Sequence, residues 1–202
     1  MRRLARNILY ALNELLPALF WIFLMLGFDE VYIALMTLCA AAIHELGHYA
    51  TVLFLRCDAD LPLGHISGMR IRERRMMSYR DKIAVLAAGP LANLAVALLL
   101  FPFARRSGYI MTFAALNLIT ALSNLLPIES YDGYSILIEA ARWHGCEWAV
   151  GLLERISFLL LAATALLSLI IMYLYNGGYW IYGLFAAQLL GKMAKNLKYG
   201  IF

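Results

Sequence analysis

His44, Glu45 and His48 are the residues of this 202-residue sequence whose types and spacing are most typical of chemistry. They form the pattern HExxH within the apolar stretch 31–55. On a helix, histidines at positions i and i+4 project from one face, so both imidazoles can bind the same metal ion. Two imidazoles leave positions for a further protein ligand and a water molecule, as catalytic zinc requires. Glu45 would then take a proton from zinc-bound water and pass it to a leaving amine.

The position of this motif separates it from a chance HExxH in a soluble helix. Apolar residues fill 38–43 before it and most of 49–55 after it. An ionisable side chain within a membrane helix is costly and indicates a functional site by default. Three such side chains within five residues therefore favour metal catalysis.

A third protein ligand is expected from the segment 124–133, where Asp132 supplies a carboxylate. Counted inward from the outer ends of their spans, His44 and Asn124 each lie about 20 Å along a helix. The irregular stretch after Asn124 can therefore reach the depth of the histidines, where such backbone is tolerated if it lines a cavity. An ordinary Asp-Gly turn explains the same residues equally well on spacing alone.

Asn93 is a second polar residue inside an apolar stretch, 83–104, where it follows Gly89 and Pro90. Pro90 frees a backbone carbonyl, and Gly89 permits close helix packing. The Asn93 amide could hold a substrate carbonyl or steady the neighbouring span. A structural hydrogen bond between helices is the simpler of these two explanations.

The composition indicates that these residues lie in a membrane protein. Hydrophobic residues make up 63% of the chain and charged residues only 15%, against about half and a quarter in soluble domains. Such an excess cannot be hidden in the core of a chain this small. Roughly 20 apolar residues are needed to cross a bilayer, and six stretches reach or approach that length: 8–28, 31–55, 83–104, 109–126, 156–175 and 178–190.

The expected fold is therefore an all-α polytopic membrane protein with about six transmembrane helices, in a single domain covering 1–202. Alternating polarity with Gly and Pro in the connection 57–82 predicts a small cytoplasmic-side β-hairpin. The mixed sequence of 134–154 predicts an amphipathic helix at the membrane surface.

The formal net charge of +4 does not indicate nucleic-acid binding, because the cations gather at the ends of apolar stretches. They lie in the N-terminal residues, in the connection 56–82 and in the tail 192–198. Basic residues are retained in the cytoplasm. We therefore expect a multi-pass protein of the cell membrane with both termini in the cytoplasm.

Three motifs together resemble the site-2 protease family of intramembrane metalloproteases. They occur in the family's order along the chain: HELGH at 44–48, Gly89-Pro90 with Asn93, and Asn-Leu-Leu-Pro at 124–127 leading to Asp132-Gly133. Outside these motifs the layout resembles the compact six-span bacterial branch that includes a stage IV sporulation protease. The connection 57–82 is too short for a PDZ domain, and the tail after residue 190 is too short for a CBS domain.

The resemblance implies one Zn²⁺ per chain, bound by His44, His48 and Asp132, with Glu45 as the general base. It favours Asp132 over the turn explanation. Family members often have apolar, Pro-rich residues before the Asp-Gly pair, whereas this chain has Glu129, Ser130 and Tyr131. Glu129 is therefore a competing third ligand, and Asp132 is preferred because it matches the family position.

The resemblance also implies that the chain cleaves a membrane-anchored protein within or next to its transmembrane segment. Typical substrates are a transcription factor, its precursor or an anti-sigma-type regulator. Asn93 and Asn124 would help to seat the substrate, and the edge of the hairpin at 57–82 could pair with it.

Two functions from other classes remain as alternatives. A metal transporter or channel needs a continuous polar path, and the other spans contain few ionisable residues. A non-catalytic relative that only binds a partner helix has no need of Glu45. Both alternatives are therefore less favoured than a protease.

Overall fold

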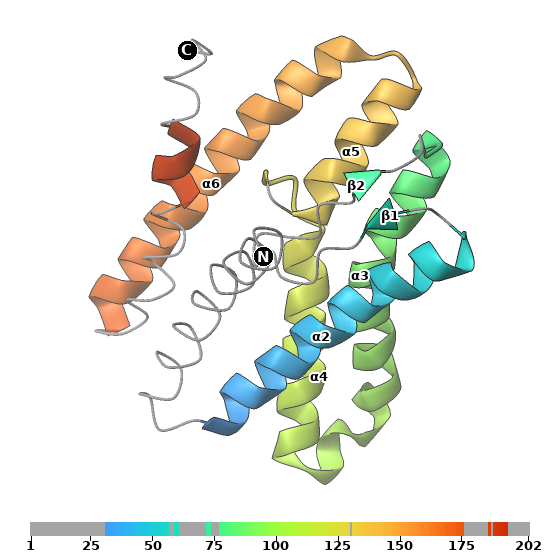
Figure 1. Cartoon of the computed structure of the whole chain (residues 1–202). Coiled ribbons are helices and arrows are strands. Elements are labelled where there is room, and N and C mark those ends of the chain that lie inside the picture. Colours follow the sequence, from blue (N-terminus) through green and yellow to red (C-terminus); the bar gives the residue numbers. More distant parts are fainter. Residues whose placement is uncertain are drawn as a thin grey trace, which may run out of the picture. The chain divides into compact units, whose positions relative to one another are not determined.

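The computed structural model describes residues 31–56, 59–60, 72–73, 77–129, 131–175, 186 and 188–193 (Figure 1). The chain divides into two compact units, Met1–Leu126 and Pro127–Phe202. The expected span 8–28 and most of the expected span 178–190 lie outside the described residues. The expectation of a single domain stays a prediction.

The first unit is built from three helices that contact one another. Helix α3 packs against both α2 and α4, and α2 also contacts α4 (Figure 1). A short 3-10 helix, η1, connects α3 to α4. The bounds are Val31–Phe54 for α2, Tyr79–Leu100 for α3, Phe101–Arg106 for η1 and Gly108–Asn124 for α4.

Local sequence explains where α2 ends and where α3 begins. After α2, Arg56 has a φ of 51°, and a residue in this left-handed conformation ends a helix. Before α3, the Ser78 hydroxyl oxygen accepts a hydrogen bond from the backbone N–H of Asp81 at 3.1 Å. The same hydroxyl donates to the Asp81 carboxylate at 2.7 Å. This reciprocal cap fixes the register from which α3 enters the bundle.

Glycine allows α2 and α3 to approach closely at the depth of the histidine motif. A Cβ atom added at Gly47 would lie 2.5 Å from the carbonyl oxygen of Ala88 and 2.8 Å from the Cβ of Ala92. Neither the backbone nor a Cβ atom can move aside as the end of a long side chain can. Gly47 therefore sets the separation of the two helices, as small residues do at membrane helix interfaces.

The second unit contains α5 (Asp132–Trp143) and α6 (Glu147–Tyr175), which pack against each other, and a C-terminal helical segment, 188–193. The expected single amphipathic helix over 134–154 is wrong. Helix α5 stops at Trp143, Gly145 turns the chain with a φ of 68°, and α6 begins at Glu147. The second half of the expected surface helix is therefore the start of a long apolar helix.

The all-α membrane class fits the structure, but one of the expected spans needs correction. Three helices in the described part of the chain are long and apolar enough to cross a membrane: Val31–Phe54, Tyr79–Arg106 and Glu147–Leu174. Helix α4, expected as a fourth span at 109–126, has 17 residues and is not among them.

The expected β-hairpin over 57–82 is also corrected. The described residues of this connection contain only two strands of two residues each, Ala59–Asp60 and Arg72–Glu73, which pair antiparallel. The remainder of the segment between them lies outside the described residues. Two residue pairs do not make an extended hairpin edge, and the described residues contain no other strand.

The close approach at Gly47 predicts the effect of adding one methyl group there. Gly47→Ala should lower the free energy of unfolding by about 1–3 kcal/mol, because the helices must separate to admit the new Cβ. The matched control is Gly151→Ala in α6, where an added Cβ meets nothing within 4 Å. That change should stabilise by about 0.5–1 kcal/mol through helix propensity. Unfolding in mixed micelles measures both, and equal stability of the two variants would contradict the packing described here.

Candidate metal centre

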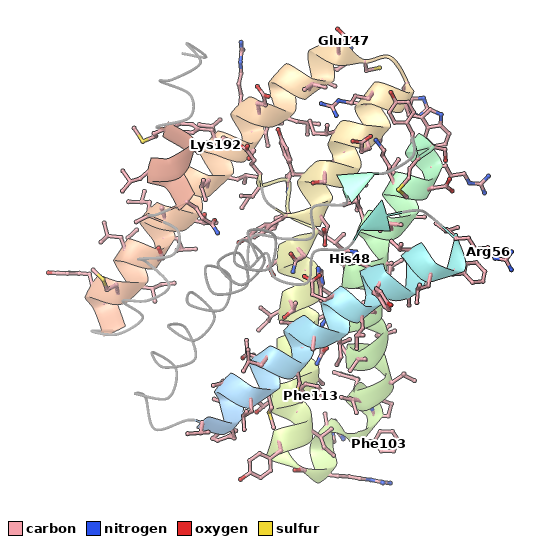
Figure 2. All side chains as sticks on the ribbon, viewed as in Figure 1. His48, Arg56, Phe103, Phe113, Glu147 and Lys192 are labelled. Carbon is pink, nitrogen blue, oxygen red and sulfur yellow. The ribbon has the colours of Figure 1, made fainter. Side chains whose placement is uncertain are left out.

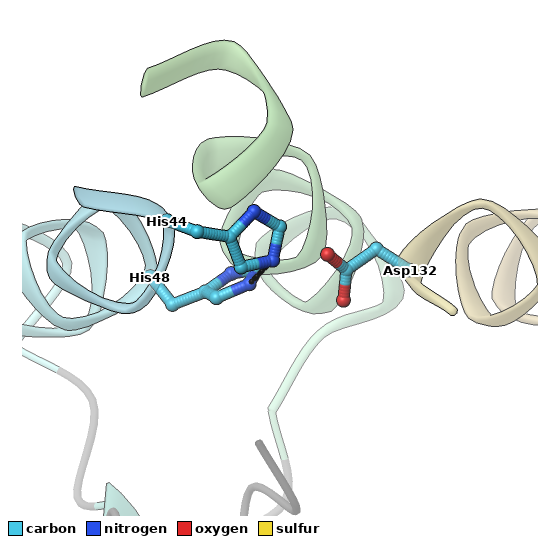
Figure 3. A group of neighbouring side chains, drawn as sticks. All are labelled: His44, His48 and Asp132. Atoms are coloured by element: carbon cyan, nitrogen blue, oxygen red, sulfur yellow. Dashed lines mark hydrogen bonds between the residues drawn. The ribbon is translucent and has the colours of Figure 1, made fainter. Parts of the chain in front are cut away.

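His44 and His48 lie together on one face of α2, turned into the first unit. Their side chains are buried, with 7% and 2% of their surface exposed. The two Nε2 atoms are 3.1 Å apart, and the rings meet edge to face (Figure 3). The predicted i, i+4 pairing of the imidazoles is therefore present in the structure.

The Nδ1 atoms of both rings face acceptors. His48 Nδ1 lies 2.7 Å from the carbonyl oxygen of Val85 on α3, which can only accept. His44 Nδ1 lies 3.1 Å from Oδ1 of Asn93 on the same helix. The Asn93 amide is oriented by its own nitrogen, which donates to the carbonyl of Ala40 at 2.8 Å and to Oδ1 of Asn117 at 2.9 Å. Both histidines must therefore carry a proton on Nδ1.

This arrangement leaves two Nε2 lone pairs directed at each other when both rings are neutral. Such lone pairs repel at 3.1 Å unless a cation lies between them. Two imidazole nitrogens bound to one tetrahedral zinc ion at 2.0–2.1 Å are separated by about 3.3 Å. The histidines therefore fit a zinc ion with little adjustment, and their Nδ1–H groups make the hydrogen bonds that orient zinc-bound histidines.

Gly89 makes room for this pair on α3. A Cβ atom at this position would overlap Nε2 and Cε1 of His48 and would lie 2.9 Å from Cε1 of His44. The rings thus lie directly against the α3 backbone. This contact explains the presence of Gly89 more closely than general helix packing does.

Glu45 is half-buried on α2, directly after His44. Adjacent positions on a helix differ by about 100° in direction. The carboxylate is thus next to the paired imidazoles along the chain but does not share their face. This position suits a general base better than a third ligand.

The other predicted ligands belong to the second unit. Asp132 is the half-buried first residue of α5, a position where the helix dipole favours a carboxylate. The Glu129 carboxylate forms an ion pair with Lys192 at 3.3 Å.

The two asparagines expected to bind substrate lie in different surroundings. Asn93 is fully buried, and its amide makes the three hydrogen bonds described above. This favours the helix–helix explanation of Asn93. Asn124 is half-buried at the end of α4 and donates to the Thr120 carbonyl of its own helix at 3.0 Å. A role of either residue in substrate binding stays a prediction.

Sequence reasoning missed Asn117 and the carbonyl of Val85. Asn117 is fully buried on α4 and accepts from Asn93, so it supports the residue that orients His44. An Asn inside an apolar stretch was a visible signal of such a role. A backbone carbonyl leaves no signal in the side-chain sequence.

The first unit is thus a bundle of apolar helices that holds a buried, oriented histidine pair, with a glutamate directly after the first histidine. No protein-family model matches the chain. No curated protein matches it either. Among solved structures, the chain is similar to the Site-2 Protease from Methanocaldococcus jannaschii, with a TM-score of 0.58 and 16% sequence identity over 92% of this chain and 87% of that one. The chain therefore has a site-2 protease fold.

The hydrogen bond to Asn93 predicts a loss of metal affinity when the amide is removed. Asn93→Leu should lower zinc affinity about 10- to 100-fold, because His44 loses the acceptor that fixes its ring. Competition with a chromophoric chelator, on detergent-purified protein checked for folding by thermal unfolding, measures this change. Asn124→Leu is the matched control and should bind zinc as the unmodified chain does. Unchanged affinity in Asn93→Leu, with weaker substrate binding, would instead assign Asn93 to the substrate.

Proposed function

We propose that the chain is a zinc-dependent intramembrane protease that hydrolyses a peptide bond within or next to a transmembrane segment. The observation that carries this proposal is the pair of Nε2 atoms 3.1 Å apart, held by Nδ1 hydrogen bonds within an apolar helical bundle. The site-2 protease fold supports the same reaction class. Glu45 next to this pair supplies the base that a purely metal-binding protein would not need.

Asp132 is the proposed third ligand. A carboxylate completes the two-histidine set of a catalytic zinc site and leaves one position open for water or substrate. Glu129 was the competing candidate, and its ion pair with Lys192 makes it the less suitable of the two. Asp132 also matches the Asp-Gly position of the family that the sequence resembles.

In the proposed hydrolysis, His44, His48 and Asp132 bind the metal ion and Glu45 transfers the proton. A bound zinc ion would acidify water and polarise the scissile carbonyl. Glu45 accepts the proton of the attacking water as its oxygen bonds to the carbonyl carbon. Glu45 then delivers that proton to the amide nitrogen as the carbon–nitrogen bond breaks, which yields a carboxylate and an amine. Hydrogen bonds to Asn93 and Val85 fix the rings of His44 and His48. The two metal-binding nitrogens would therefore stay in place while Glu45 accepts and releases the proton.

The proposed substrate is a membrane-anchored protein, because the histidine pair lies within an apolar helix that could span the bilayer. Regulatory proteins such as a transcription factor, its precursor or an anti-sigma-type regulator are the expected class. The proposed location is the cell membrane, with both termini in the cytoplasm, on the charge distribution of the connections.

Two substitutions in the motif separate binding from catalysis. Glu45→Gln should retain about one zinc per chain, because the carboxylate is not a ligand, and should lose cleavage by at least about 100-fold. His44→Ala should lose both zinc and cleavage. Zinc is measured by elemental analysis of purified protein. Cleavage is measured by comparing new N-termini of membrane proteins in cells that express each form.

The outcomes also distinguish the alternative functions. Retained cleavage by Glu45→Gln would defeat the mechanism. Zinc binding without any Glu45-dependent new N-terminus would favour a metal-binding scaffold. Zinc uptake into vesicles that survives Glu45→Gln would favour a transporter.

A further inference from the structure

Lys192 is a nearly buried cation in the second unit, on the C-terminal helical segment 188–193 (Figure 2). Only 8% of its surface is exposed. An ammonium group has three N–H donors, and three acceptors surround Nζ. They are Oγ of Ser157 at 2.8 Å, a carboxylate oxygen of Glu129 at 3.3 Å and the carbonyl oxygen of Glu154 at 3.4 Å. The buried charge is therefore compensated, as a retained buried charge must be.

Ser157 connects this cation to the backbone that precedes Asp132. Its side chain is fully buried on α6. The hydroxyl oxygen accepts from Lys192 and also from the backbone N–H of Glu129, at 2.7 Å. Glu129 is thus held twice, through its backbone by Ser157 and through its carboxylate by Lys192.

The Ser157–Lys192 contact is not a nucleophilic dyad. The hydroxyl is inaccessible and accepts two hydrogen bonds. Nζ of Lys192 is also engaged in an ion pair with the Glu129 carboxylate at 3.3 Å. The cluster therefore holds the chain in place and does not react.

A second contact from the same segment reaches the residue before Asp132. The Tyr131 side chain hydrogen-bonds with Gln188, while burial, the larger effect, raises the pKa of the phenol. Gln188 and Lys192 are four residues apart, so they share one helical face. This face therefore contacts the loop at two residues, Tyr131 and Glu129.

Tyr134 on α5 lies beside Lys192, with Nζ 6.0 Å from the ring centre. Burial and then the carboxylates of Glu129 and Glu154 raise the pKa of Tyr134 to about 12. The phenol is therefore neutral at physiological pH. Glu129, and not Tyr134, supplies the countercharge to Lys192.

We propose that Lys192 is a positioning residue, which with Ser157 and Glu129 fixes the backbone at 127–129, before Asp132, and thereby positions the Asp132 carboxylate as a metal ligand. This inference rests on the proposed function, in which Asp132 is a zinc ligand. The described residues 127–129 are not helical, yet a ligand must be held within about 0.5 Å of its productive position. The buried ion pair and the Ser157 hydroxyl supply that restraint.

The test compares Lys192→Met with Lys192→Arg and with a control, Arg155→Met, which removes a cation from an exposed position on α6. In Lys192→Met, zinc affinity should fall about 10- to 100-fold. The kcat should fall with it while KM is unchanged, and backbone hydrogen exchange should accelerate at 128–135. Lys192→Arg keeps the charge and should lie closer to the unmodified chain. Arg155→Met should match the unmodified chain in every measurement.

Two results would overturn the proposal. One is a folded Lys192→Met protein with hydrogen exchange at 128–135 like that of Arg155→Met. The other is faster exchange there with unchanged zinc affinity. If Lys192→Met does not fold, Ser157→Ala, which removes one hydroxyl, should show the same changes to a smaller extent, and unchanged exchange in that variant would count against the proposal.

The same experiment separates this proposal from the proposed function. Failure of the unmodified chain to bind zinc or to cleave would reject the protease function. Hydrogen exchange at 128–135 would then still decide whether Lys192 restrains the loop.

Discussion

The structure of the candidate site depends on two imidazoles, His44 and His48, whose Nδ1 atoms both donate hydrogen bonds. Val85 and Asn93 accept from Nδ1 of His48 and His44, so when both rings are neutral the two Nε2 atoms present lone pairs to each other at 3.1 Å. Both rings are buried, so repulsion between the lone pairs is weakly screened. A metal ion turns this repulsion into attraction. The same contacts thus suit the two histidines to bind a metal ion.

The three helices of the first unit are arranged to make this pairing possible. Gly47 and Gly89 bring α2 and α3 so close that the rings lie on backbone and not on side chains. The amide of Asn93 then connects α3 to α2 through Ala40 and to α4 through Asn117. Buried amides in a membrane protein are costly unless fully hydrogen-bonded. The hydrogen bonds of the Asn93 amide therefore hold the three helices together and also orient the His44 ring.

The sequence predicted the parts of this site that depend on spacing within one helix. The pairing of His44 with His48 needs only helical periodicity, and the bounds of α2 differ from the expected span by one residue. Contacts between helices were harder to predict. A structural hydrogen bond between helices was the simpler explanation of Asn93, and only packing shows that its amide faces His44 and Asn117.

Secondary structure was predicted less well outside the apolar helices, because the local sequence there only weakly favours one conformation over another. The alternating pattern in 57–82 predicted a hairpin, but the described residues there form only two residue pairs. The amphipathic segment 134–154 was read as one helix because its polarity is mixed throughout. The left-handed turn at Gly145 divides it, and a single glycine in a helical pattern is a weak signal. In the sequence, Lys192 is one of several cations in the C-terminal tail. Its buried ion pair with Glu129 could not be predicted, because the two residues meet only in the folded second unit.

The central claim is that a zinc ion is held by two histidines and one carboxylate, and X-ray absorption at the zinc edge tests it most directly. Zinc-loaded Glu45→Gln protein should show two imidazole ligands at about 2.0–2.1 Å together with oxygen ligands at similar distances. Asp132→Ala should lose zinc affinity, whereas Glu147→Gln, a change at an exposed carboxylate that also begins a helix, should leave the spectrum unchanged. A spectrum with fewer than two imidazoles, or full zinc affinity in Asp132→Ala, would contradict the account.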